Sequence, residues 1–124
     1  LFYLNKMSCL FNSLSHFLKN VNSSQLRQII CKYLQTNPKI LDDIPASDIT
    51  TWENSTNLQD YIKKMSLTST WGGAIEIKCF CELFKVDVKV KHKNRIINFT
   101  PTDKSVSKGI ATILYTGNHY EPER

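Results

Sequence analysis

Two residues that lie far apart in the sequence have side chains that could carry out nucleophilic catalysis together. Cys9 opens an amphipathic stretch within residues 5–11 (NKMSCLF), and His119 follows the last apolar run within residues 117–121 (GNHYE). A thiol becomes a strong nucleophile when a base removes its proton, and that base is often a histidine distant in sequence but adjacent in the fold. The pair predicts a cysteine-dependent hydrolase.

Cys9 is expected on the polar side of a helix that begins at this residue. Cys9, Ser13 and His16 fall on one side of that helix, at about 100° per residue. The other side holds the apolar residues of the segment, namely Leu10, Phe11, Leu14, Phe17 and Leu18. A cysteine that only fills the core should lie with the leucines, so this position favours a thiol that faces a cleft. The alternative is a buried cysteine that acts as a small hydrophobic residue.

The start of the predicted helix also suits a reactive thiol. The free amides and the positive end of the helix dipole stabilise a thiolate in the first turn. The preceding residues, Lys6, Met7 and Ser8, would place backbone N–H groups near the thiol, where an oxyanion could bind.

Of the three histidines, His119 has the position expected of a catalytic base. His16 lies two helical turns from Cys9, about 10 Å away, which is too far for proton transfer. His92 falls in a predicted turn among lysines, where we expect it to be solvated. His119 follows a glycine break at the end of an apolar strand, and Glu121 points to the same side of an extended chain, where it could orient the imidazole. A solvated Glu121 is the alternative.

The apolar pattern predicts helices first and strands afterwards. Helices are expected from Cys9 to Leu18, over 26–34 with Ser23 or Ser24 as N-cap, over 58–65, and after Trp71-Gly72-Gly73. Residues 45–57 are expected to form a loop, with a short helix opened by Ser47. Four strands are expected after the helices. They are the alternating valines over 86–90, a pairing strand over 96–99, the apolar run 110–115 and a further extended segment at 119–120. The fold class is therefore α+β, with helices packed on a small, mostly antiparallel sheet in one domain over residues 1–124.

Composition narrows the class of protein. The net charge is +5, but the basic residues are spread along the chain and form no recognisable reading motif, so we expect no specific nucleic-acid binding. No apolar stretch has the length needed to cross a bilayer, and residues 1–6 lack the pattern of a signal peptide. We expect a cytoplasmic protein without a membrane partner, acting as a monomer.

The four cysteines do not predict disulfides or a metal centre. Cys9, Cys31, Cys79 and Cys81 are too few and too clustered for a disulfide scaffold. On a helix, the side chains of Cys79 and Cys81 point about 200° apart, so they cannot coordinate one metal ion. We interpret Cys81 as part of the core. We expect neither a metal nor a cofactor.

Taken together, three blocks of sequence resemble the ovarian-tumour (OTU) family of cysteine proteases. The blocks are residues 9–13 (CLFNS), residues 61–77 (YIKKM…TWGGAIEI) and residues 115–121 (YTGNHYE), in the order found in the family. The resemblance spans nearly the whole chain. It implies an OTU-like, papain-type fold and hydrolysis of bonds formed by ubiquitin or a ubiquitin-like protein, the partner expected on this basis.

The resemblance also implies roles for individual residues. Cys9 matches the family's nucleophile, His119 its general base, and Glu121 the position where many members carry an Asp or Asn. Trp71 and Tyr120 would wall a narrow channel for the Gly-Gly tail of ubiquitin. The family usually has Asp-Gly-x-Cys at the nucleophile, whereas residues 6–9 here are KMSC.

Two other classes of function remain open at this stage. The altered turn before Cys9 would suit a non-catalytic OTU-like module that binds ubiquitin or another protein. A basic nucleic-acid-binding domain would instead predict strongly salt-dependent binding and no thiol reactivity.

Overall fold

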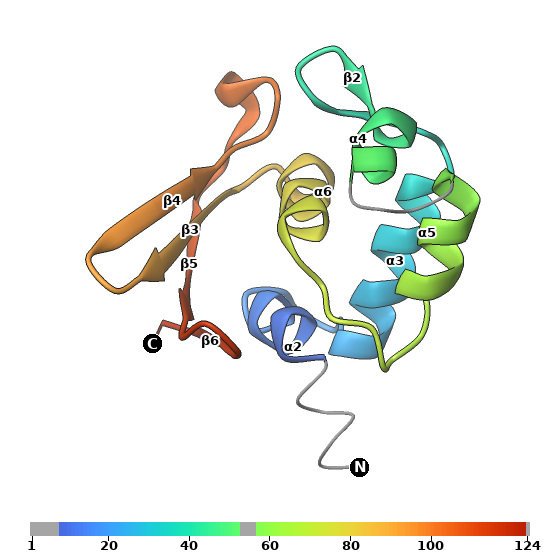
Figure 1. The fold of residues 1–124 in the computed structure, drawn as a ribbon. Coiled ribbons are helices and arrows are strands. Elements are labelled where there is room, and N and C mark those ends of the chain that lie inside the picture. The colour runs from blue at the N-terminus through green and yellow to red at the C-terminus, as the bar shows by residue number, and fades with distance from the viewer. Residues whose placement is uncertain (1–7, 53–56, 124) are drawn as a thin grey trace.

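A four-stranded mixed sheet lies against a set of helices (Figure 1). The computed structural model describes residues 8–52 and 57–123. The strands follow in the order β4 (Arg95–Phe99), β3 (Asp87–His92), β5 (Ile110–Tyr115) and β6 (Tyr120–Pro122). The β3–β4 and β5–β6 pairs are antiparallel and the β3–β5 pair is parallel. The predicted α+β class, with a mostly antiparallel sheet, is confirmed.

The helices lie on one side of the sheet. They are α2 (Cys9–Ser15), α3 (Ser23–Leu34), α4 (Ala46–Trp52), α5 (Leu58–Met65) and α6 (Ala74–Phe84), and a 3₁₀ turn, η1 (Lys104–Val106), precedes β5. Helix α6 lies nearest to the sheet and packs between β3 and α3, and α5 packs on the far side of α3. Helix α2 packs between α3 and strand β6, which brings the N-terminal helix beside the last strand. Among the described residues, no helix is long and apolar enough to span a bilayer.

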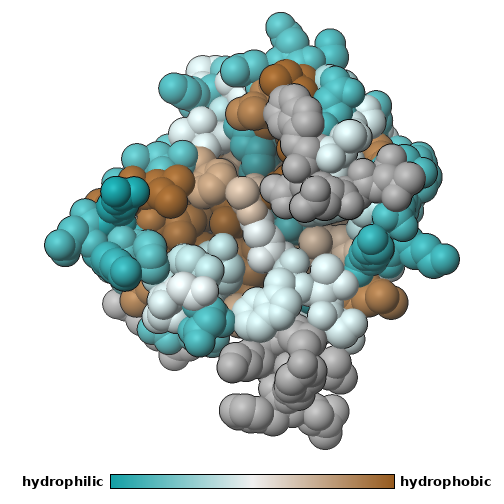
Figure 2. Space-filling model, viewed as in Figure 1, coloured by the Kyte–Doolittle hydropathy of each residue, from teal (hydrophilic) through white to brown (hydrophobic). Residues whose placement is uncertain are grey.

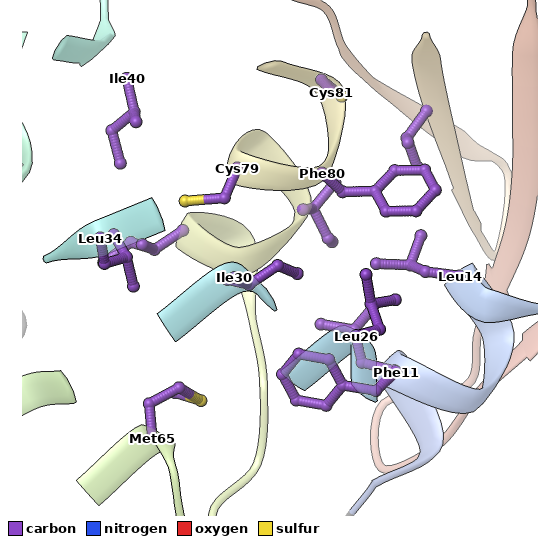
Figure 3. Close-up of a cluster of buried hydrophobic side chains, with 14 of the residues drawn as sticks. Phe11, Leu14, Leu26, Ile30, Leu34, Ile40, Met65, Cys79, Phe80 and Cys81 are labelled. Carbon is purple, nitrogen blue, oxygen red and sulfur yellow. The ribbon is translucent and has the colours of Figure 1, made fainter. Parts of the chain in front are cut away.

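The core is formed where α2, α3 and α6 meet, as Figure 3 shows. Phe11 and Leu14 of α2 point toward Leu26 and Ile30 of α3 and toward Phe80 of α6, and all five are at most 1% exposed. Burial of side chains of this size stabilises the fold by roughly 1.5–3 kcal/mol each.

The sheet closes this core with one of its faces. Val88 and Val90 of β3 lie opposite Ala111 and Ile113 of β5, and all four are buried. The predicted alternation of valines and charged residues is therefore a half-buried strand. By contrast, β4 is open on both faces, since the adjacent Ile96 and Ile97 are each about half exposed. Figure 2 shows this hydrophobic area over the sheet, bordered by hydrophilic residues.

Three boundaries differ from the sequence-based expectations, and one hairpin was not expected. Helix α2 ends at Ser15 and not at Leu18, because the Phe17 and Leu18 amides donate three residues back, to Leu14 and Ser15, and close a turn. The N-cap of α3 is Asn22, and not Ser23 or Ser24 as expected. The Asn22 side chain accepts a hydrogen bond from the Gln25 backbone N–H in a capping box. Asn is an equally good capping residue, and the reciprocal Gln25 contact decides between the candidates. Helix α4 begins at Ala46, not at Ser47. A short hairpin, β1 (Lys39–Leu41) and β2 (Ile44–Pro45), was not predicted, because its strands are too short to show a period.

The segment before α6 is packed directly on α2. A Cβ atom added to Gly72 would lie 2.8 Å from Leu10 Cδ2 and 3.0 Å from Phe11 Cε2. A Cβ at the next residue, Gly73, would meet nothing within 4 Å. The absence of a side chain at Gly72 therefore sets how closely this segment approaches the helix that carries Cys9.

This pair of glycines provides a matched test of the packing. We expect Gly72→Ala to lower the free energy of unfolding by roughly 1–3 kcal/mol, because the buried side chains of α2 must shift to admit the methyl group. Gly73→Ala is the control and should lower it by less than Gly72→Ala does, by about 0.5–1 kcal/mol at most, the cost of alanine at the N-cap of α6. Urea unfolding followed by circular dichroism measures both, and equal effects at the two positions would contradict the packing described.

Candidate active site

Cys9 is buried at the first turn of α2, against strand β6. Its exposed fraction is 2%, and Ser13, on the same side of the helix, is 1% exposed. The polar side of α2 therefore faces β6, and the expectation that Cys9 opens onto a free cleft is wrong. The helix is covered on both sides: its apolar side meets α3 and α6, and its small polar residues allow β6 to approach closely.

The backbone of Tyr120 contacts the thiol directly. The Tyr120 N–H donates a hydrogen bond to Cys9 Sγ at 3.3 Å, across 111 positions of sequence. Tyr120 directly follows His119 in the sequence. The fold therefore places the backbone beside the candidate base in contact with the candidate nucleophile, Cys9.

The turn that carries His119 is held by several hydrogen bonds. Tyr115 and Tyr120 are paired across β5 and β6, and their rings stack with centroids 4.6 Å apart. The Thr116 N–H donates to the His119 carbonyl at 2.9 Å, and the Tyr115 hydroxyl donates to the Gly117 carbonyl at 2.7 Å. Gly117 has φ +103°, a conformation that favours glycine. The predicted glycine break is thus a tight turn with a defined geometry.

His119 and Glu121 lie on the same side of the extended chain, as the period of a strand requires. His119 Nε2 is 3.8 Å from Glu121 Oε2, beyond hydrogen-bond distance but within range of electrostatic attraction. The two side chains are 43% and 52% exposed, so water screens this attraction.

A groove of about 480 Å³ lies beside this turn. It is lined by Trp71, Gly72, Gly73, Tyr115, Gly117, Asn118 and Tyr120. Trp71 and Tyr120, the two residues expected to wall a channel, therefore line the same groove. Burial, followed by the neighbouring Tyr115 and Cys9, raises the pKa of Tyr120 to about 12, so its hydroxyl stays neutral at physiological pH.

The predicted oxyanion turn is only partly described. Lys6 and Met7 lie outside the described residues. Ser8 is buried with φ −97° and ψ 14°, and its carbonyl accepts from the Asn12 N–H at 2.9 Å, which starts helix α2.

The other two histidines lie away from this site. His16 is exposed and packs edge-on against Phe17 at 5.1 Å. His92 is half-buried, and its Nδ1 lies 2.8 Å from the Tyr115 carbonyl, so the expectation of a solvated ring is wrong. Its neighbour β5 accounts for the difference, because pairing across the parallel strands places Tyr115 beside it.

Sequence reasoning missed two buried charged residues, Arg27 and Glu76, each 1% exposed. Arg27 donates to Ser8 Oγ at 3.1 Å, and Glu76 accepts from the Gly73 N–H at 2.7 Å. The available signal for Arg27 was its position. It lies four residues before Cys31 and seven before Leu34, on the buried side of α3.

Cys31, Cys79 and Cys81 belong to the core. Burial raises the pKa of Cys31 to about 11 and that of Cys81 to about 12, and it raises the pKa of Cys79 even further. Across residues 8–52 and 57–123, no group of three or more potential metal ligands comes together.

Comparison with known proteins identifies the family. Residues 8–120 match the profile described as OTU-like cysteine protease. The chain belongs to the OTU family. The resemblance carried by the three sequence blocks is therefore confirmed.

Relatives of this OTU chain include an insect enzyme and several solved structures. Ubiquitin thioesterase Otu1 of Drosophila melanogaster is 27% identical over 120 residues, covering 93% of this chain and 32% of the relative. The chain thus spans about a third of the curated relatives that it matches. An OTU domain solved in complex with ubiquitin has a TM-score of 0.73 at 24% identity, covering 93% of this chain and 62% of that one. The viral OTU protease of Dera Ghazi Khan virus has a TM-score of 0.66 at 17% identity, covering 93% and 72%.

We expect iodoacetamide to modify only Cys9 in the folded OTU domain at pH 7–8. Cys9 lies outside the hydrophobic core cluster and contacts Tyr120, which lines the groove. The other three thiols belong to that cluster and have raised pKa values, so little thiolate forms at those positions. Peptide mapping by mass spectrometry identifies the modified residue. Cys9→Ala should take up no label, while unfolded wild-type protein should label at all four cysteines. Labelling at Cys31, Cys79 or Cys81 ahead of Cys9 would contradict this assignment.

The raised pKa values also predict a loss of stability in alkali. In the unfolded chain, a thiol titrates near pH 8.5, whereas in the fold the pKa of Cys31 is about 11. The folded state therefore holds a proton that the unfolded state loses, and the free energy of unfolding falls as the pH rises from about 8.5 toward 11. Urea unfolding across this range should show a shallower fall for Cys31→Ala than for wild type. Identical slopes would contradict the prediction.

Proposed function

We propose that this OTU domain is a deubiquitinase that hydrolyses isopeptide or peptide bonds formed by the C-terminus of ubiquitin or a ubiquitin-like protein. The observation that carries the proposal is the 3.3 Å hydrogen bond between the Tyr120 N–H and Cys9 Sγ. It ties the cysteine at the start of α2 to the turn that bears His119, beside a groove. The names of the curated relatives and the solved complexes with ubiquitin support the choice of substrate.

In the proposed reaction, His119 takes the proton from the Cys9 thiol. The thiolate attacks the carbonyl carbon of the ubiquitin C-terminal glycine, and the carbonyl oxygen becomes an oxyanion. When the intermediate collapses, the C–N bond breaks and protonated His119 gives its proton to the leaving lysine amine. Water, with His119 as the base, then hydrolyses the thioester and releases ubiquitin.

Other residues would position the reacting groups. The backbone amides from Lys6 to Cys9 would bind the oxyanion. Glu121 would hold the Nε2 side of the His119 ring, which leaves Nδ1 to face the thiol; the 3.8 Å separation from Glu121 supports this orientation.

The groove beside the site would take the C-terminal tail of ubiquitin. Trp71 and Tyr120 line it together with Gly72, Gly73 and Gly117, and three glycines in its lining leave little side-chain bulk. An extended chain ending in two glycines fits such a passage, whereas bulky side chains at these positions would meet the aromatic walls.

We further propose that residues 1–124 act as one catalytic domain, as a monomer in the cytoplasm and without nucleic acid. The buried free cysteines support a reducing compartment. Light scattering at a mass of 14.3 kDa would support the monomer.

Hydrolysis of ubiquitin bearing a fluorogenic C-terminal amide tests the proposed reaction. Cys9→Ala should abolish turnover, and His119→Ala should lower kcat by roughly 10²–10⁴-fold, the usual contribution of a general base. Glu121→Ala should cost less, on the order of tenfold, because the pair is long and exposed. His16→Ala, which removes an exposed histidine just after α2, is the matched control and should leave kcat unchanged.

The same assay separates the proposal from its alternative. The substitution of Lys6 and Met7 for the family's usual Asp-Gly favours a non-catalytic module that binds ubiquitin. Folded protein that binds ubiquitin but turns over no ubiquitin or ubiquitin-like substrate would establish that alternative. Turnover that survives Cys9→Ala would contradict both.

A further inference from the structure

The side chain of Arg27 connects three parts of the active site. Its Nη1 donates to the carbonyls of Met65 and Thr70, each at 2.9 Å, and its Nη2 donates to Ser8 Oγ at 3.1 Å. The guanidinium carbon lies 4.3 Å from the centre of the Phe11 ring, close enough for a cation–π contact. One buried group thus contacts the residue before Cys9, the helix that bears Cys9 and the segment leading to the groove.

The groove wall is held at both ends by buried charges of opposite sign. Arg27 binds the carbonyl of Thr70, at the start of residues 70–73. Glu76 accepts from the Gly73 N–H at 2.7 Å, at the end of that segment, and from the Tyr61 hydroxyl at 2.5 Å. Between these anchors, Gly72 rests on the side chains of Leu10 and Phe11.

A bridge of this kind suits an arginine and no other side chain. The planar guanidinium places donors in fixed directions, so Nη1 and Nη2 reach different segments at the same time. A lysine has one nitrogen and could not reach Ser8 and Thr70 together. A charged group with so little exposure is costly to bury unless its hydrogen bonds are made, so the segments that accept them are held firmly.

We propose that Arg27 is a positioning residue for the OTU reaction, which fixes the turn that presents Cys9 relative to the groove wall at residues 70–73. It touches neither the thiol nor the substrate and acts through Ser8 and Thr70. The proposal rests on the thiol chemistry of the proposed function.

Two substitutions separate the two arms of the bridge. Ser8→Ala removes only the link to the turn before Cys9. We expect kcat on the ubiquitin amide to fall about tenfold with KM within about twofold, the size expected for one lost hydrogen bond to a charged donor. Ser8→Thr keeps the hydroxyl and should restore kcat. Arg27→Lys breaks both arms, so kcat should fall by roughly a hundredfold and KM should rise.

Two further measurements distinguish positioning from simple stability. The rate at which iodoacetamide modifies Cys9 should fall in Ser8→Ala and Arg27→Lys, and this readout needs no ubiquitin. Thermal unfolding shows whether each variant is folded at the assay temperature. The control is Arg95→Lys, at an exposed arginine in β4. It should leave kcat, the rate of Cys9 modification and the unfolding temperature unchanged.

The outcomes decide the proposal. If wild-type protein does not turn over the ubiquitin amide, the proposed function fails, while the iodoacetamide rates still test Arg27. Folded Ser8→Ala with wild-type kcat and a wild-type rate of Cys9 modification would overturn the positioning role, whether or not Arg27→Lys folds. The positioning role would also be overturned if Arg27→Lys regained wild-type kcat and a wild-type rate of Cys9 modification at a temperature where the variant is fully folded.

Discussion

The packing of α2 between strand β6 and helix α3 is the constraint on which the site depends. One side of this helix places Phe11 and Leu14 in the core, while the other places Cys9 and Ser13 against β6. Because both sides are packed, the contacts of α2 fix the position of Cys9 beside strand β6. The hydrogen bond from the Tyr120 N–H to Cys9 Sγ follows from this packing of α2 against β6.

The two candidate catalytic residues lie in different surroundings. Cys9 is on a buried helix, whereas His119 is on a turn at the surface, 43% exposed at its side chain. The turn must therefore obtain its geometry from backbone hydrogen bonds, from Gly117 and from the stacked tyrosines. A substrate lying over this turn would exclude water and strengthen the attraction between His119 and Glu121.

Much of the fold could be predicted from periodicity. The core side of α3, the helix after Trp71-Gly72-Gly73 and the alternating strand β3 each showed a clear pattern, and each forms as expected. The hairpin at 39–45 showed none, because two- and three-residue strands have no period. The position of Cys9 on the polar side of its helix was correct, but its exposure was not. A helical pattern shows which residues share a side, and it cannot show that a distant strand covers that side.

The candidate site was predictable where chemistry dictated residue type, and obscure where it depended on buried polar contacts. Cys9 and His119 stood out by type and place, whereas Trp71 and Tyr120 were indicated by the resemblance to the OTU family. The structure brings Cys9 to Tyr120 and lines one groove with both aromatics. Arg27 did not stand out, since two of its partners are the carbonyls of Met65 and Thr70, which any residue would provide, and the third is one serine hydroxyl, Ser8 Oγ. Every residue has a backbone carbonyl, so the sequence does not show which carbonyls accept a hydrogen bond from a buried side chain.

Every proposed step at this site requires Cys9 to be the nucleophile for the ubiquitin C-terminus. The most direct measurement treats the folded protein with ubiquitin carrying a thiol-reactive electrophile at its C-terminus and maps the adduct by mass spectrometry. We expect one ubiquitin per chain, attached at Cys9 and lost in Cys9→Ala. An adduct on another cysteine, or none from folded protein whose Cys9 reacts with iodoacetamide, would contradict it.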